Sequence, residues 1–151
     1  MDKELRQQVL TLLDQHRIMT LATTRPDGWP QATTVGYAND GLTLYFLCGP
    51  QSQKAANLAR DNRVSLAIDH DTPQVMEITG LSMAARAQKV SDTEEAQRAI
   101  NLLMQRYPEQ TGLPLPMPSP ADVQIFRLTP VVISVLDYSK GFGHTDLVNC
   151  D

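Results

Sequence analysis

The sequence predicts a mainly β fold, in which six to seven antiparallel strands form a small barrel flanked by three helices. Three extended runs, 18–24, 30–38 and 42–48, follow one another closely and are separated only by short turns. The turns contain Pro-Asp-Gly and Asn-Asp-Gly, in which Pro fixes φ and Gly accepts a positive φ. A short helix and a fourth strand over 64–68 follow, so the strands are expected to form a meander before the first internal helix.

Composition indicates one soluble domain covering 1–151. The chain has 151 residues, 42% of them hydrophobic and 20% charged, which suits a single globular domain. Its net charge of −4 argues against a nucleic-acid partner, which would require a concentrated basic face. The chain contains no apolar run of about 18 residues, no secretory signal and no C-x-x-C pair. We therefore expect a cytoplasmic protein without a membrane partner.

The first helix is expected over 1–15, where it would cover one end of the barrel. Its apolar stripe has helical spacing and comprises Leu5, Val9, Leu12 and Leu13. In the run 42–48, both sets of alternating residues are largely apolar, which predicts a central strand buried on two sides. Trp29, the only tryptophan, either packs over an edge of the barrel or covers a planar ring.

The second half of the chain continues the pattern of strands and helices. A long strand is expected over 74–90, in which Gly80 marks a bulge or a close backbone approach. The capping-box sequence 91–94 predicts the start of the third helix. Five prolines make 107–121 a stiff connector rather than a helix.

Two final strands are expected over 123–128 and 131–138, separated by Thr129 and Pro130. The tail, 139–151, is rich in glycine but retains Phe142 and His144. Because aromatic residues are unusual in a frayed end, this tail is expected to fold over a neighbouring chain or a ligand.

The start of the second helix is a candidate anion site. Ser52 can cap the helix, and Lys54 lies in its first turn. The first N–H groups of a helix lack partners and attract anions. A lysine there opposes the helix dipole, and a bound anion would relieve that conflict. The alternative is that Ser52 is purely a structural cap and Lys54 is solvated. When the short motif Ser-x-Lys is considered by itself, this alternative is favoured over an anion site.

Other catalytic patterns are absent from the sequence. It contains no nucleophile elbow, no P-loop and no G-x-G-x-x-G. Its three histidines, His16, His70 and His144, do not have the spacing of metal ligands. Asp69, His70 and Asp71 are more typical of a polar turn than of a metal site. We expect no metal, and the residues identify no catalytic acid or nucleophile.

Several short motifs, in order and at matching spacing, resemble the pyridoxamine 5′-phosphate oxidase-like family of FMN-binding split barrels. They are Met19-Thr-Leu-Ala-Thr, Asp27-Gly-Trp-Pro, Leu44-Tyr-Phe-Leu, Ser52-Gln-Lys54, Asn57-Leu58, Asn62-Arg-Val-Ser-Leu66 and Gln74-Val-Met-Glu-Ile-Thr-Gly80. The likeness covers most of the chain. It implies a split, Greek-key-like barrel and a homodimer that holds FMN in clefts between its two subunits.

The resemblance also implies a set of cofactor-binding residues. Lys54 would hold the FMN phosphate, with assistance from Ser52, and Gln53 would stand beside them. Gln74 would hydrogen-bond the flavin. The remaining expected wall residues are Gln31, Ala32, Thr33, Thr34, Leu47 and Cys48. In this arrangement Cys48 is part of the wall and not a catalytic thiol.

Departures from the family pattern narrow the expected function. Gln53 stands where the true oxidase has an arginine, and 31–35 lacks the basic residues of R-x-x-L-L-K. We therefore expect a short, stress-protein-like member rather than a true pyridoxamine 5′-phosphate oxidase. The expected activity is transfer of hydride or electrons from a reduced nicotinamide to a small acceptor. The alternatives are a flavin- or haem-binding sensor without turnover, and a deazaflavin-dependent reductase, which a more basic groove would favour.

Overall fold

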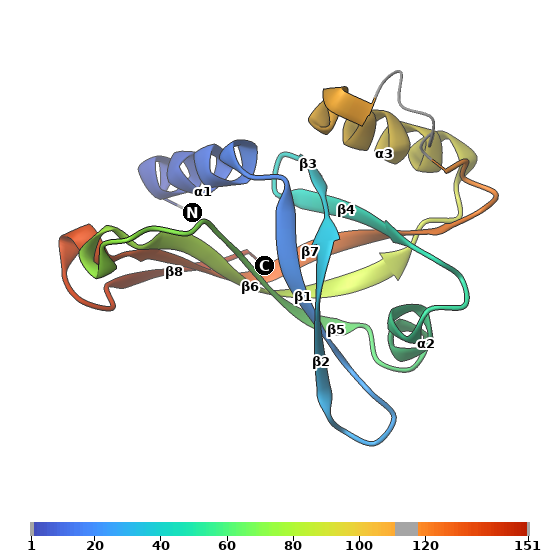
Figure 1. Ribbon diagram of the computed structural model, residues 1–151, viewed down its shortest axis with the longest axis horizontal. Coiled ribbons are helices and arrows are strands. Elements are labelled where there is room, and N and C mark those ends of the chain that lie inside the picture. The colour runs from blue at the N-terminus through green and yellow to red at the C-terminus, as the bar shows by residue number, and fades with distance from the viewer. Residues whose placement is uncertain (1, 111–117, 151) are drawn as a thin grey trace.

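The computed structural model describes residues 2–110 and 118–150, and its strands form one antiparallel sheet (Figure 1). The strands are β1 (Ile18–Thr24), β2 (Pro30–Gly36), β3 (Ala38–Asp40), β4 (Thr43–Cys48), β5 (Arg63–Asp69), β6 (Thr79–Lys89), β7 (Gln124–Asp137) and β8 (Thr145–Asn149). The helices are α1 (Lys3–Gln15), α2 (Gln53–Arg60) and α3 (Thr93–Arg106). Short 3₁₀ turns are η1 (Val75–Glu77), η2 (Pro108–Gln110) and η3 (Tyr138–Lys140).

The strand order is β2-β1-β5-β6-β7-β4-β3, and β8 pairs with the free side of β7. The sheet curls into a half-barrel, with α1 and α3 toward one side and α2 near the opposite end (Figure 1). The predicted fold class, mainly β and antiparallel with three flanking helices, is confirmed. None of the helices in the described part of the chain is both long and apolar enough to cross a bilayer.

β7 is one continuous strand, so the prediction of two separate strands around Thr129 and Pro130 was wrong. It pairs with β6 along nearly its whole length, and its other side pairs first with β4 and then with β8. Pro130 lies between these two neighbours, where the register with β6 shifts at Ala84 and Ala85. Because a proline cannot donate to a sheet, this gap between partners accommodates it without breaking the strand.

Two other segments differ from their predicted boundaries. The run 30–38 is divided into β2 and β3 at Tyr37, whose N–H donates to the Arg17 carbonyl at 3.0 Å. The predicted tail contains η3 and then β8, so part of it belongs to the sheet. Of the predicted connector 107–121, residues 111–117 lie outside the described residues.

The third helix begins one residue later than the capping box predicted. Its N-cap is Asp92 rather than Ser91, and the Asp92 carboxylate accepts from the N–H of Glu95 at 2.9 Å. Both residue types favour this position, because their side-chain oxygens satisfy N–H groups of the first turn. The sequence pattern therefore located the helix start but not the capping residue.

Burial divides the apolar residues into two clusters. The larger fills the curled sheet beneath α1 and α2, and its members include Val9, Leu13, Leu21, Leu44, Phe46, Leu58, Leu66, Met83 and Leu128. The smaller lies under α3 and comprises Tyr45, Val90, Ala96, Ala99, Ile100 and Ile125. β4 contributes to both clusters, so it is buried on both faces, as predicted.

Gly80 marks a close backbone approach, one of the two predicted alternatives. A Cβ at this position would lie 2.8 Å from the Ile68 carbonyl oxygen. This distance is shorter than any real Cβ contact, so the pairing of β5 with β6 here requires glycine. The register shift itself occurs farther along β6.

Candidate functional site

The N-terminus of α2 follows β4 through a short turn that Ser52 organises. Its hydroxyl accepts from the N–H of Ala55 at 3.1 Å and donates to the Gly49 carbonyl at 2.8 Å. Both roles belong to the cap itself, and the donor of the hydroxyl is already used. Ser52 therefore caps α2 and shapes the turn, which both predicted alternatives include.

Lys54 is the free cation of this turn. Its side chain is half-buried, and it makes no hydrogen bond or ion pair with any residue in the described ranges. A lysine in the first turn of a helix faces the positive end of the dipole. Lys54 thus raises the local positive potential where the free N–H groups of α2 point.

Cys48 lies at the end of β4, close enough to Ser52 and Lys54 for both residues to lower the pKa of its thiol. Its side chain is buried, and burial raises the pKa of the thiol, whereas Ser52 and Lys54 act in the opposite direction. The net rise leaves the thiol protonated at neutral pH. Cys48 is therefore suited to a wall position and not to nucleophilic catalysis.

An asparagine that the sequence analysis did not assign to the site joins α2 to the first hairpin. Asn57 is fully buried, and its amide donates to the Thr23 hydroxyl at 2.9 Å and to Gln31 at 3.1 Å. Its oxygen accepts from the Gln53 side chain at 2.8 Å. The network brings Gln31 and Gln53 together and satisfies the buried amide. In the sequence, the only indication of this role was that Asn57 lies at a buried position of a short amphipathic helix.

The four predicted residues of β2 do not share one face. Gln31 and Thr33 are half-buried, whereas Ala32 and Thr34 are exposed, as alternation along a strand requires. The Thr33 hydroxyl oxygen is buried without a hydrogen-bond partner among the described residues. A buried hydroxyl without a hydrogen-bond partner is unusual in a protein.

Leu47 and Cys48 point to opposite sides of the sheet. Leu47 packs against the cluster beneath α3, whereas Cys48 belongs to the main core. Only Cys48 is therefore on the side of the sheet that contains Leu21 and the core face of α2. The structure brings Cys48, Ser52, Gln53, Lys54 and Gln31 to one region and leaves Leu47 outside it.

Gln74 lies at the opposite end of the molecule from Lys54. It is exposed and precedes η1, beyond the end of β5 that is remote from α2. The seven residues of β5 separate these ends by roughly 20 Å. In Figure 1 the green turn that follows β5 lies beside the red C-terminal turn, far from α2. One copy of the chain therefore does not unite all the predicted site residues.

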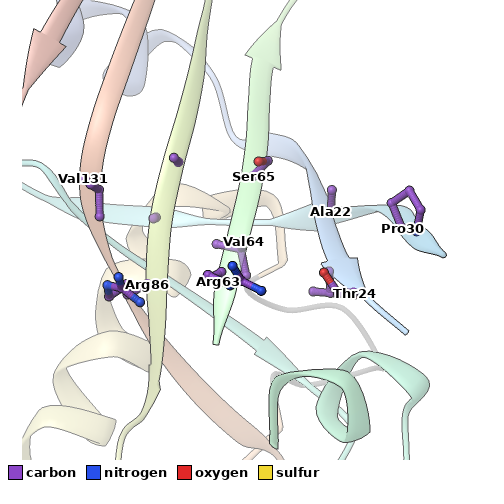
Figure 2. A pocket seen from close by; sticks show the side chains of 11 residues that line it. Ala22, Thr24, Pro30, Arg63, Val64, Ser65, Arg86 and Val131 are labelled. Atoms are coloured by element: carbon purple, nitrogen blue, oxygen red, sulfur yellow. The ribbon is translucent and has the colours of Figure 1, made fainter. Parts of the chain in front are cut away.

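An open hollow of about 520 Å³ lies on the outer side of the sheet, away from the core. Figure 2 shows Arg63 and Arg86 together near one end of it. These arginines are cross-strand neighbours, and Arg63 is bound by Asp61 through two hydrogen bonds of 2.8 and 3.0 Å. None of the ten predicted cofactor residues lines this hollow.

Small residues surround the hollow and continue across the sheet. We call this surface the outer face; it comprises Thr20, Ala22, Ala32, Thr34, Ser65, Ala67, Ser82 and Ala84. In the sequence, this outer face is indicated by small residues that alternate with large apolar residues along β5 and β6. The short side chains of this face permit close approach of another surface.

Comparison with protein families and curated proteins gives matches over much of the chain. A family model described as pyridoxamine 5′-phosphate oxidase matches residues 5–137. General stress protein 26 of Bacillus subtilis (strain 168) is 29% identical over 69 residues, which are 46% of this chain. The match spans 49% of that relative, so about half of its length is covered.

Solved structures with similar folds come from several bacteria. A conserved hypothetical protein from Mycobacterium tuberculosis is 27% identical, with a TM-score of 0.75 over 99% of this chain and 93% of its own. A heme binding protein from Mycobacterium smegmatis is 19% identical, with a TM-score of 0.76 over 99% of this chain and 59% of its own. HutZ, the heme storage protein from Vibrio cholerae, is 21% identical, with a TM-score of 0.66 over 82% of this chain and 88% of its own. At their lower identities, the latter two matches show the fold alone.

Proposed function

Because this chain belongs to the pyridoxamine 5′-phosphate oxidase family, we propose that it is an FMN-binding oxidoreductase. In this proposal, hydride or electrons pass from a reduced nicotinamide to a small acceptor. The observation that carries the proposal is the cation at the start of α2. Lys54 has no anionic partner among the described residues, although it lies where a phosphate would also meet helix N–H groups.

The residues around this turn fit a phosphate, but with fewer donors than the true oxidase would supply. Lys54 is the binding cation, whereas the hydroxyl of Ser52 and the amide of Gln53 are engaged within the chain. We therefore expect moderate rather than tight FMN binding. Vitamin B6 synthesis is not proposed, since Gln53 replaces the second basic residue of the oxidase motif.

The proposed flavin wall rests on β2 and the end of β4. The Thr33 hydroxyl, which has no hydrogen-bond partner among the described residues, and the Cys48 side chain belong to this proposed wall, and both are buried within the single chain. Asn57 holds α2 against the first hairpin, which fixes the distance between Lys54 and this wall. FMN, when bound, supplies the hydride and electron chemistry, and the chain supplies position and exclusion of water.

The proposal includes a homodimer. Gln74 can take part in a flavin site only if a second copy brings it there, because it is remote from Lys54 in its own chain. The outer face supports such an arrangement, since its small side chains permit close contact over several strands. Light scattering of the FMN-loaded protein tests this part, and a stable loaded monomer would contradict it.

FMN titration of the purified protein tests the cofactor assignment. We expect retained flavin absorption near one FMN per chain, and Lys54→Ala should weaken binding by about 1.5–3 kcal/mol. The matched control is Lys3→Ala, an exposed lysine of α1, which should leave FMN binding unchanged. Equal affinity of Lys54→Ala and the unsubstituted protein would remove Lys54 from the site.

A separate measurement tests the proposed reaction. Under anaerobic conditions, NADH or NADPH should bleach the bound flavin, and an added acceptor should restore its absorption. Restoration of the spectrum identifies an oxidoreductase. Flavin that binds but is not reduced by either nicotinamide would instead favour a sensor.

Haem is the second candidate ligand, because two of the similar folds carry names that refer to heme. Haem iron requires an axial ligand, often histidine. His144 is the histidine to substitute, because its Nε2 atom lies 3.1 Å from a carboxylate oxygen of Asp146, whereas its Nδ1 atom makes no hydrogen bond with any described residue. A Soret band after haem addition that is lost in His144→Ala, together with no FMN binding, would favour haem over flavin.

A further inference from the structure

Two histidines from distant parts of the chain meet at the end of α1. His16 is the C-cap of this helix, and His70 follows β5, 54 residues later. The Nε2 atom of His16 lies 3.2 Å from the Nδ1 atom of His70. Their ring centroids are 5.4 Å apart, and the ring planes differ by 21°. Two imidazole nitrogens thus face one another at the surface of the molecule.

The backbone orients the first of these rings. Nδ1 of His16 lies 2.7 Å from the Leu12 carbonyl oxygen, to which it donates because a carbonyl can only accept. In the neutral ring this hydrogen bond leaves the lone pair on Nε2, directed toward His70. Metal-binding histidines are held in the same way, by a hydrogen bond from the nitrogen that does not bind the metal.

The separation of the two nitrogens matches that of a chelated transition metal. Two zinc–nitrogen bonds of about 2.0–2.1 Å that meet at the tetrahedral angle hold their nitrogens about 3.3 Å apart. The observed separation of 3.2 Å is close to this value, and a metal between the rings would replace the hydrogen bond that joins them, with the proton of His70 moving from Nδ1 to Nε2. We propose that His16 and His70 form a two-histidine site for a borderline divalent cation such as Zn²⁺ or Cu²⁺.

The surroundings define what kind of site this is. In the described part of the chain, no group of three or more His, Cys, Asp and Glu side chains is placed to hold a metal. Water would therefore complete the coordination shell, and the metal would exchange readily. The site lies at the negative end of the α1 dipole, which favours a cation, although Arg106 already binds the His16 carbonyl there. A metal bound to both rings would connect α1 to the segment between β5 and β6.

Isothermal titration of the tag-free protein with Zn²⁺ tests this proposal. We expect one Zn²⁺ per chain, and Mg²⁺ should not bind, because it prefers oxygen ligands. Removal of a residue that only hydrogen-bonds a metal ligand typically lowers metal affinity about 10–100-fold. His70→Gln or His16→Gln removes a ligand itself, so either should weaken Zn²⁺ binding by at least this factor. The matched control is His144→Gln, which substitutes the third histidine and should retain the unsubstituted affinity.

A second readout concerns the ligands themselves. Cu²⁺ should bind more tightly than Zn²⁺, and its electron paramagnetic resonance spectrum should show coupling to two imidazole nitrogens. His70 lies in an exposed turn, so circular dichroism should show His70→Gln folded. The proposal is overturned if the unsubstituted protein binds no Zn²⁺, or if folded His70→Gln binds Zn²⁺ with undiminished affinity.

Discussion

The guanidinium of Arg106, in the last turn of α3, donates to the His16 carbonyl at the end of α1 over 2.7 Å. It also donates to the Leu13 carbonyl and lies over the ring of Tyr37, 5.3 Å from the ring centroid. Tyr37 donates to the same Leu13 carbonyl at 2.7 Å. Two side chains from elsewhere in the chain therefore satisfy carbonyls that α1 leaves without partners.

Replacing Arg106 by methionine should destabilise the protein. The change preserves much of the apolar stem but removes the donors to the α1 carbonyls, at a cost of about 1–3 kcal/mol in the free energy of unfolding. Urea unfolding followed by circular dichroism measures this loss. Arg6→Met, at an exposed position of α1, serves as the control and should change stability little. Equal midpoints for the two variants would contradict the capping role.

Replacing Asn57 by alanine should loosen the contact between α2 and the first hairpin. It leaves the polar groups of Thr23, Gln31 and Gln53 without their shared partner. We expect a loss of about 1–3 kcal/mol in the free energy of unfolding. The control is Asn101→Ala, which removes an exposed amide that bonds only Gln97 among the described contacts. A stability change at Asn57 no greater than at Asn101 would show that the network contributes nothing.

Substituting Gly80 by alanine should be far more costly than the same change at Gly49. The Cβ at Gly80 would lie 2.8 Å from the Ile68 carbonyl oxygen, whereas a Cβ at Gly49 would meet no atom within 4 Å. Because the obstacle is backbone, β5 and β6 must separate locally, at a cost of about 1–3 kcal/mol. Thermal unfolding of the two variants gives the comparison. Similar melting temperatures would refute the close approach.

Acid should weaken the attachment of α3 through Glu95. The Arg127 guanidinium, which bonds both carboxylate oxygens at 2.6 Å, and then the Tyr45 hydroxyl hold the pKa of Glu95 below its ordinary value of 4.5. A lowered pKa in the folded state contributes stability that is present above the unfolded value and is lost as pH falls through the folded value.

The free energy of unfolding should therefore decrease as pH falls below about 4.5, and Glu95→Gln should make this decrease shallower. Urea unfolding at a series of pH values measures the slope. Glu94→Gln, at the neighbouring exposed position, should keep the slope of the unsubstituted protein. If both variants have the same slope, the ion pair does not determine the acid response.

Local signals in the sequence were sufficient to predict the main elements of this fold. Alternating residues and turns identified β1, β4 and β5, and helical spacing identified α1 and α3. The continuity of β7 could not be predicted in this way, because Pro130 is tolerated only where the strand changes neighbours, a property of the assembled sheet. Likewise, β8 is short and polar, and it becomes a strand because β7 offers a free side.

The candidate site was less accessible to sequence reasoning. The position of Lys54 followed from the spacing of a helix start, and that part needs only local structure. The buried role of Asn57 depends on Thr23 and Gln31, which come from another hairpin. The pairing of His16 with His70 joins residues 54 positions apart, beyond the reach of ligand-spacing rules.

Because β7 is bonded to three other strands, it affects how the sheet unfolds. Its backbone is bonded to β6 on one side and, in succession, to β4 and β8 on the other. Neither β4 nor β8 can separate from the rest of the sheet without breaking bonds to this strand. Protons on its amides should therefore exchange with solvent deuterium only through global unfolding, whereas those of the edge strands β2 and β3 exchange through local fraying. The part of the sheet under α3 and the part that carries the C-terminus thus form one cooperative unit.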